Sequence, residues 1–172
     1  MPTSLRVIFA ALLAASVVTV NAQTFPSKPV RIIIPFPPGA GPDIVARTAG
    51  VALTGRWAQQ VLVDNRPGGG GNIATEIAAK AAPDGYTLLL ASNHVTINPS
   101  LFKAVPYDPV RSFAPVIHLD MTAVLAMPDI RHALMLQGLE TVASTSEDFV
   151  AYIQNDIAKW ARVVRDAHVR VD

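Results

Sequence analysis

The chain has 172 residues, a formal net charge of +1 and no cysteine. That length suits one domain with a sizeable core and leaves little room for two complete domains. The near balance of charge gives no reason to expect nucleic acid or an anionic membrane as a partner, and the lack of cysteine excludes disulfides, thiolate metal ligands and a cysteine nucleophile.

The N-terminal segment has the pattern of a secretory signal peptide. Arg6 is the only charged residue before an apolar run from Val7 to Val20, and the small residue Ala22 follows. The run is shorter than the roughly 20 apolar residues that a bilayer core requires, which favours a cleaved signal over a retained membrane anchor. We therefore expect export to the periplasm with cleavage after Ala22.

From residue 30 onward the pattern alternates between strands and helices. The β-branched run Val30–Pro35 predicts a strand that is buried on both faces. Apolar residues at helical spacing then predict a helix over Pro42–Arg56, with Pro42 in its first turn and Gly55 as its stop.

Two more strands and a second helix are predicted next. They are a strand at Val61–Asp64, a glycine loop at Pro67–Gly71, a helix at Ile73–Ala82 with Asn72 as its N-cap, and a strand at Thr87–Ala91. This order implies right-handed crossovers and a parallel sheet with the first strand in the middle, which is half of a doubly wound α/β fold.

The second half of the chain is less regular. Asn98–Ser112 carries three prolines and is predicted to be an ordered surface segment. A helix is predicted over Pro128–Gln137, with Gly138 as its C-terminal stop. Short strands are predicted at Ala114–Leu119, Ala123–Leu125 and Glu140–Ala143.

A long helix is predicted at the end of the chain. A capping box begins it, formed either by Ser144 with Glu147 or by Thr145 with Asp148. One apolar face follows at helical spacing. It consists of Phe149, Ile153, Ile157, Trp160 and Val164.

A ligand site is expected where the parallel strands end. In open parallel sheets, ligands bind at the carboxyl ends of the strands, and two predicted loops, Phe36–Gly41 and Ser92–Thr96, leave such ends. The first loop enters a helix, so free backbone N–H groups and the positive end of the helix dipole favour an anion. The expected ligand-binding residues are Pro38, Gly39, Ala40, Gly41, Asp43, Ser92, Asn93 and His94.

Two of these residues have a structural alternative. Asp43, in the first helical turn, complements the helix dipole whether or not it touches a ligand, and we favour that structural role. His94 is either a ligand contact or a partly exposed loop residue.

Enzymatic motifs fail in detail. Gly39 and Gly41 begin a dinucleotide fingerprint, but Ile44 occupies the position of its third glycine, and the glycines before Asn72 lack the Lys-Ser or Lys-Thr pair of a phosphate-binding loop. The four histidines have no metal-ligand spacing, and no serine lies in a nucleophile elbow. We expect no enzyme activity, no metal and no cofactor. A small hydrolase or nucleotide enzyme would require activity that depends on His94 or Asp43.

Three long segments carry a family resemblance. Phe25–Arg47, Val63–Ser92 and Ile97–Val116 resemble, in this order, the N-terminal lobe of the Bug-type receptors, the periplasmic substrate-binding proteins of tripartite tricarboxylate transporters. Arg131–Val171 is similar to the extreme C-terminus of the same family. The resemblance implies one lobe of a type II periplasmic-binding-protein fold.

The resemblance also implies that a central segment is missing. Family members are roughly twice as long and close two α/β lobes on their ligand, so we expect an internal deletion between about Met121 and Arg131 that removes most of the second lobe. The expected division is a signal peptide at 1–22, a partial ligand-binding lobe at 23–126 and a helical C-terminal segment at 127–172.

The implied function is transport. The resemblance implies a monomeric receptor that binds a dicarboxylate, tricarboxylate or amino acid and passes it to membrane permease subunits. Ala40 and Pro42 replace the glycine and the Thr or Ser usual in the family, and Pro42 removes a hydroxyl and a backbone donor at the helix entry. The alternative is a truncated remnant without a transport role.

Overall fold

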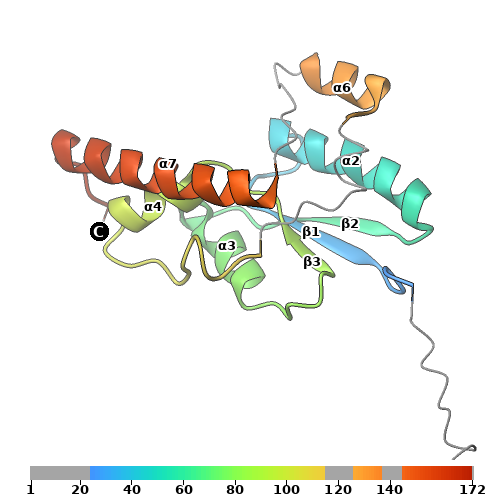
Figure 1. Cartoon of the computed structure of the whole chain (residues 1–172), viewed down its shortest axis with the longest axis horizontal. Helices are drawn as coiled ribbons and strands as arrows, with labels where there is room; N and C mark the ends of the chain where they lie inside the picture. The colour runs from blue at the N-terminus through green and yellow to red at the C-terminus, as the bar shows by residue number, and fades with distance from the viewer. Residues whose placement is uncertain (1–23, 115–125, 137–144, 172) are drawn as a thin grey trace, which may run out of the picture.

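The fold is built on a small parallel sheet, as the sequence predicted. In the computed structural model, which describes residues 24–114, 126–136 and 145–171, the strands β1 (Val30–Ile34), β2 (Val61–Asn65) and β3 (Thr87–Leu89) pair in the order β2-β1-β3. β1 is therefore central and parallel to both neighbours (Figure 1). The α/β class and the central position of the first strand are confirmed. The expected signal peptide lies outside the described residues.

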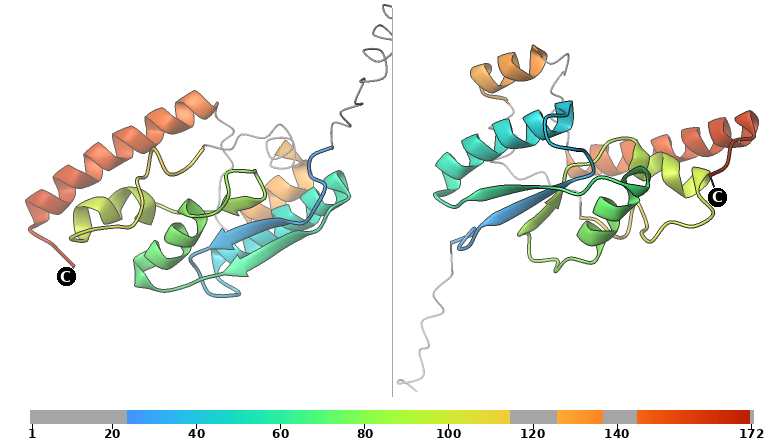
Figure 2. Two further views of the ribbon diagram at one scale, coloured as in Figure 1. Left: turned by 90° about the horizontal axis from the view of Figure 1, so that it is seen from below. Right: turned by 180° about the vertical axis from the view of Figure 1, so that it is seen from behind.

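Two helices cover opposite faces of this sheet. α2 (Gly41–Trp57) packs on β1 and β2, and α3 (Asn72–Ala79), which follows the short 3₁₀ turn η1 (Gly69–Gly71), packs on β1 and β3. Figures 1 and 2 show α2 on one side of the sheet and α3 on the other. The chain crosses from the central strand β1 through α2 to β2, and then from β2 through α3 past β1 to β3. Two right-handed crossovers in opposite directions place their helices on opposite faces.

The core lies between α2 and the sheet. Ile32 and Ile34 of β1 pack with Ala46 of α2, and apolar residues of β2 and β3 surround them. Gly50 of α2 lies against β2, where an added Cβ would meet the Val61 side chain at 3.4 Å. The missing side chain at Gly50 thus allows the middle of α2 to pack closely on β2.

Several predicted boundaries are wrong. α2 does not stop at Gly55; it continues to Trp57 and ends at Ala58, which has a φ of 51°. The N-cap of α3 is Gly71, with a φ of 92°, and Asn72 is the first helical residue. The side-chain oxygen of Asn72 does not cap the helix; it accepts hydrogen bonds from Asn98 Nδ2 and from the Tyr107 hydroxyl.

A further helix, α4 (His94–Leu101), takes up the last three residues of the predicted site loop Ser92–Thr96 and the start of the predicted surface segment. Pro99 lies within the last turn of this helix. Because proline is disfavoured inside helices, the sequence did not predict a helix here.

The long helix α7 (Ser146–Ala167) lies along α4 in both figures. The predicted capping box is present, with Thr145 and Asp148 as its pair. Within the described residues of α7 the buried side chain is Asp156, which accepts a hydrogen bond of 2.6 Å from the Thr96 hydroxyl of α4. The apolar face predicted for this helix is mostly half-buried.

The helix α6 (Pro128–Met135) packs on the outer side of α2 (Figure 1). Ile130 and Leu134 form a second small core with Leu53. The predicted helix in this region is confirmed, but it ends at Met135 with Leu136 as its cap, before the expected end at Gln137 and the stop at Gly138. Most of the residues of the predicted short strands lie outside the described residues.

Candidate functional site

The candidate site lies at the carboxyl edge of the sheet. The segment from β1 to α2 and the segment from β3 to α4 leave adjacent strands at this edge. Pro38, Gly39 and Gly41 in the first segment are exposed, as are Ser92 and Asn93 in the second. The structure thus brings together the two segments that the sequence selected.

The loop after β1 satisfies part of its own hydrogen-bonding capacity. The N–H of Gly39 donates to Asp43 Oδ2 at 2.8 Å, and the N–H of Ala40 donates to the carbonyl oxygen of Pro37 at 3.3 Å. The Gly41 N–H has no partner among the described residues, and Pro42 has no N–H to give. Of the amides expected to face an external anion, that of Gly41 is therefore the free donor.

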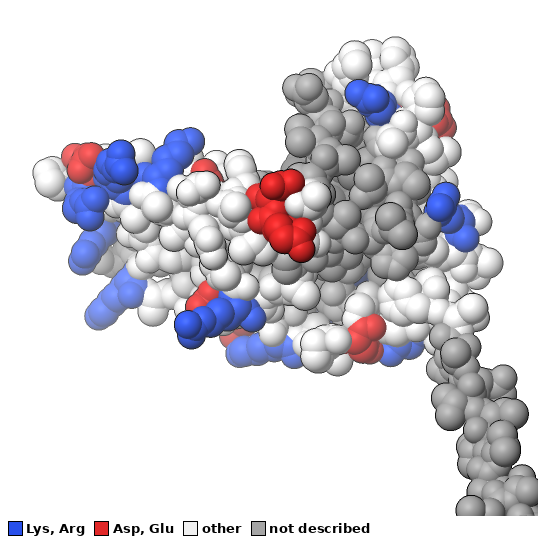
Figure 3. All heavy atoms as spheres, in the orientation of Figure 1, with Lys and Arg blue, Asp and Glu red and all other residues white. Residues whose placement is uncertain are grey.

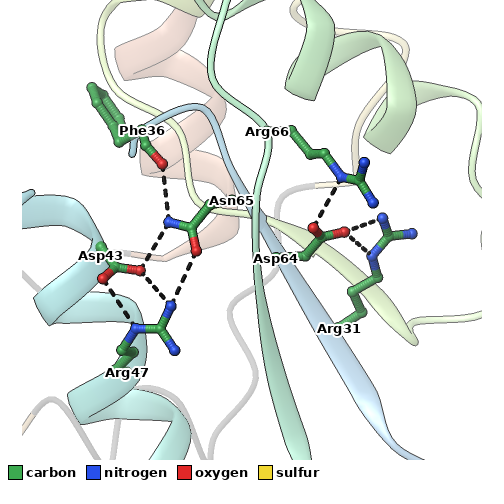
Figure 4. A network of polar contacts seen from close by, with 7 residues as sticks. All are labelled: Arg31, Phe36, Asp43, Arg47, Asp64, Asn65 and Arg66. Carbon is green, nitrogen blue, oxygen red and sulfur yellow. Dashed lines mark hydrogen bonds and ion pairs between the residues drawn. The ribbon is translucent and has the colours of Figure 1, made fainter. Parts of the chain in front are cut away.

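Asp43 acts as an internal anion at the start of α2. Its side chain is 4% exposed, and both carboxylate oxygens accept hydrogen bonds (Figure 4). Arg47 Nε lies 3.0 Å from Oδ2 and Arg47 Nη2 lies 3.0 Å from Oδ1. Asn65 Nδ2 donates to Oδ1 at 2.9 Å and to the Phe36 carbonyl oxygen at 3.0 Å. This network fastens the loop to the end of β2.

The charge state of Asp43 follows from these contacts. The Arg47 guanidinium, the Gly39 N–H and the Asn65 amide all favour the ionised form, and they hold the pKa of the Asp43 carboxyl well below its usual range against the effect of burial. A permanent carboxylate here compensates the helix dipole. The structural role of Asp43 is the one that this geometry supports.

Other carboxylates of the α/β unit also have structural partners. Asp64 pairs with Arg31 and Arg66 (Figure 4), and although burial opposes the shift, these hydrogen bonds lower the pKa of Asp64. Glu76 pairs with Lys80. Within the described ranges no group of His, Asp or Glu could hold a metal ion.

His94 is the first residue of α4, not part of a loop, and its half-buried ring contacts two other segments of the edge. Its Nε2 lies 3.1 Å from the Thr75 hydroxyl, and its Nδ1 lies 3.1 Å from the Ser92 hydroxyl. The ring meets Phe36 edge to face, with centroids 6.5 Å apart. Burial lowers the pKa of the imidazole.

Sequence reasoning missed four residues of this edge. They are Phe36, Arg47, Asn65 and Thr75. Arg47 was detectable, because it lies four residues after Asp43 on the same helix face. Asn65 and Thr75 gave no local signal, since their partners are 22 and 19 residues away in the chain.

Basic side chains gather elsewhere, at the C-terminal end of α7 (Figure 3). A shallow groove between α4 and α7 is lined there by Ser100, Arg165, His168 and Arg170 together with apolar residues. Cations at a helix C-terminus complement the helix dipole, which accounts for this clustering.

The chain matches a known receptor family. The sequence model of the family described as "Tripartite tricarboxylate transporter family receptor" matches residues 45–124 of this chain. A UPF0065 protein of Bordetella pertussis is 42% identical over 123 residues, which are 70% of this chain and 37% of the relative. A UPF0065 protein of Bordetella bronchiseptica is 39% identical over 145 residues, which are 81% of this chain and 42% of the relative. The chain belongs to the tripartite tricarboxylate transporter receptor family.

Solved members of this family share the fold. The periplasmic binding protein BugD superposes with a TM-score of 0.52 and 38% identity, over 54% of this chain and 31% of BugD. An R. palustris protein solved with adipate gives a TM-score of 0.52 and 34% identity over the same shares. The chain thus spans less than half of the length of these relatives. No helix of the described residues is long and apolar enough to cross a membrane.

Proposed function

We propose that this chain is an extracytoplasmic receptor for a small carboxylate, which it passes to the membrane permease of a tripartite tricarboxylate-type transporter. The family and the periplasmic relative BugD support the class and the location. The R. palustris relative solved with adipate supports a dicarboxylate as ligand.

One arrangement carries the proposal. The Gly41 N–H at the start of α2 and the exposed donors of Ser92 and Asn93 flank the carboxyl ends of adjacent parallel strands. A carboxylate there accepts hydrogen bonds from a helix N-terminus and from neutral side chains. Pro38, Gly39 and Ala40 shape the loop, and Asp43 holds it through the Gly39 amide.

The affinity is expected to be low. Pro42 leaves one fewer backbone donor at the helix entry, and each lost hydrogen bond to a charged group typically costs about 1.5–3 kcal/mol. The donors are also exposed, so water competes with the ligand for them.

Calorimetric titration tests the proposal. The chain without residues 1–22 is titrated with succinate, adipate, citrate and glutamate, and with adipamide as a neutral control of matched length. Heat with at least one carboxylate and none with adipamide supports the receptor function. No heat with any of the carboxylates contradicts it.

A truncated remnant without a transport role is the second candidate. The observation that favours it is length, because the alignments cover 37% and 42% of the Bordetella relatives. The family match also ends at residue 124, inside the interval where we expect the central segment to be missing. Resequencing of the gene and a test for cooperative unfolding separate the two candidates, since an intact long reading frame would remove the premise of a deletion.

A further inference from the structure

His94 connects three parts of the candidate site through one ring. Its two nitrogens reach the Thr75 hydroxyl of α3 and the Ser92 hydroxyl after β3, and its edge meets Phe36 after β1. The ring also lies directly against the backbone of Gly71, where an added Cβ would come within 2.5 Å of the imidazole. The imidazole therefore has a fixed position between a buried threonine and an exposed serine.

The threonine determines which nitrogen carries the proton. The Thr75 hydroxyl donates its single proton to the Gly71 carbonyl oxygen at 2.8 Å. Toward His94 it can then act only as an acceptor, so Nε2 of the ring must be the protonated nitrogen. In the neutral ring, Nδ1 consequently carries a lone pair. The Ser92 hydroxyl has two acceptors within reach, Nδ1 at 3.1 Å and Asn93 Oδ1 at 3.4 Å, and we assign its proton to the nearer Nδ1.

This arrangement links the Ser92 hydroxyl to the charge of His94. When the ring is neutral, the Ser92 proton points inward and the oxygen lone pairs face the solvent, where they disfavour an anion. When Nδ1 takes up a proton, it donates to the Ser92 oxygen, and the hydroxyl proton is released to bond a carboxylate. We propose that His94 is a positioning residue that converts Ser92 from an acceptor into a donor, so that carboxylate binding takes up a proton.

The surroundings of the ring are suited to this role. Among the described residues, the groups that contact it are the Phe36 ring, the Thr75 hydroxyl, the Gly71 backbone and the Ser92 hydroxyl, and none of these four is charged. With burial alone lowering its pKa, the ring is neutral in the free protein near pH 7. A bound carboxylate nearby favours the cationic ring and raises its pKa. The linkage rests on the proposed carboxylate function, whereas the tautomer does not.

Nitrogen NMR of the free protein tests the tautomer without any ligand. Histidine labelled with ¹⁵N should show a protonated Nε2 and an unprotonated Nδ1 for His94 at about pH 8, with the resonance assigned by its loss in the His94→Asn variant. An Nδ1–H tautomer at this residue would overturn the inference, whatever the protein binds.

Calorimetric titration with adipate between about pH 6.5 and pH 8 tests the linkage. This range lies above the pKa of an ordinary carboxylic acid, so the ligand stays ionised. We expect the affinity to rise about tenfold toward the lower pH, and measurements in buffers of different ionisation enthalpy should show proton uptake. His94→Asn retains a polar group toward Ser92 that cannot titrate, and Ser92→Ala removes the hydroxyl, so both should lose the pH dependence.

His168→Asn is the matched control. His168 lies at the end of α7 with a φ of 53°, a conformation that asparagine tolerates well, and this variant should keep the wild-type pH dependence. Thermal unfolding of each variant verifies its fold. Binding that is independent of pH in the wild type, or unchanged pH dependence in His94→Asn, overturns the linkage. No binding of adipate or of any other carboxylate in the panel overturns both the carboxylate function and the linkage, while the NMR result still decides the tautomer.

Discussion

Asp43 occupies a position that a bound anion would otherwise take. The Gly39 N–H, which a helix N-terminus could offer to a ligand, donates to this internal carboxylate. The loop is thereby held in one shape before any ligand arrives, so the ligand does not bear the cost of ordering it. At the scale of single residues, the candidate site therefore separates an internal anion, Asp43, from the exposed Gly41 N–H and the exposed Ser92 hydroxyl.

Replacing Asp43 should destabilise the fold. In Asp43→Asn the charge that holds Arg47 and the Gly39 N–H is lost within a buried network, which should lower the free energy of unfolding by about 2 kcal/mol. Urea unfolding measures this. Glu76→Gln is the control, because its exposed pair with Lys80 should contribute less than about 0.5 kcal/mol. Equal decreases in the free energy of unfolding would show that the Asp43 network stabilises the fold no more than an exposed ion pair does.

The same carboxyl should make the protein sensitive to acid. Since the pKa of Asp43 is lower in the folded protein than in the unfolded chain, its stabilisation is complete above the unfolded value near 4 and is lost as the pH falls below it. The urea midpoint of the wild type should therefore drop between about pH 5 and pH 3. Asp43→Asn should show a smaller drop, and parallel curves for the two proteins would contradict the assignment.

The sequence predicted these residues unequally. It indicated Asp43, because an acidic residue in a first helical turn complements the dipole locally. It could not indicate Asn65, whose bonds to Asp43 and to Phe36 depend on strand pairing. It named His94 but placed it in a loop, and the partners that define its chemistry, above all Thr75, come from another helix.

At the scale of elements, glycines occupy structurally different positions in the two helices that cover the sheet. Gly71 begins α3 with a positive φ and lies against the His94 ring, whereas Gly55 lies inside α2 with open space around it. The sequence predicted both helices but took Gly55 as a stop, because a glycine near the end of a helical pattern has the same local signal as a true terminus. α4 was missed for a similar reason, since Pro99 masks its pattern.

Alanine at these two glycines should have opposite effects. Gly71→Ala introduces a side chain at a φ of 92° and 2.5 Å from the His94 ring, so it should lower the free energy of unfolding by about 1–3 kcal/mol. Gly55→Ala should raise it by up to about 1 kcal/mol, because alanine favours the helix and meets no neighbour. Thermal unfolding compares the pair. A Gly71→Ala variant as stable as the wild type would show that the ring and the loop are not held together as described.

At the scale of the whole molecule, the parallel sheet indicates the edge where we propose that a ligand binds, but it does not indicate the affinity. The parallel strands and their crossovers were predictable, because hydrophobic patterns and turn residues are local signals. The match to the family spans less than half of the length of its relatives. Under the proposed function, binding by this chain alone would depend on exposed groups at one edge of the sheet.

A weak ligand should still stabilise such a protein measurably. A ligand that binds only the native state contributes RT ln(1 + [L]/Kd) to stability, so about 10 mM adipate acting on a Kd of about 1 mM adds about 1.4 kcal/mol. For a chain of this size, the melting midpoint should rise by about 5 °C. Adipamide at the same concentration should leave the midpoint unchanged, because its neutral ends gain nothing from the helix dipole. Since surface charges are screened by salt, about 0.5 M sodium chloride should remove most of the shift with adipate. A shift of equal size with the diamide, or a shift that resists salt, would mean that the carboxylates are not what the protein recognises.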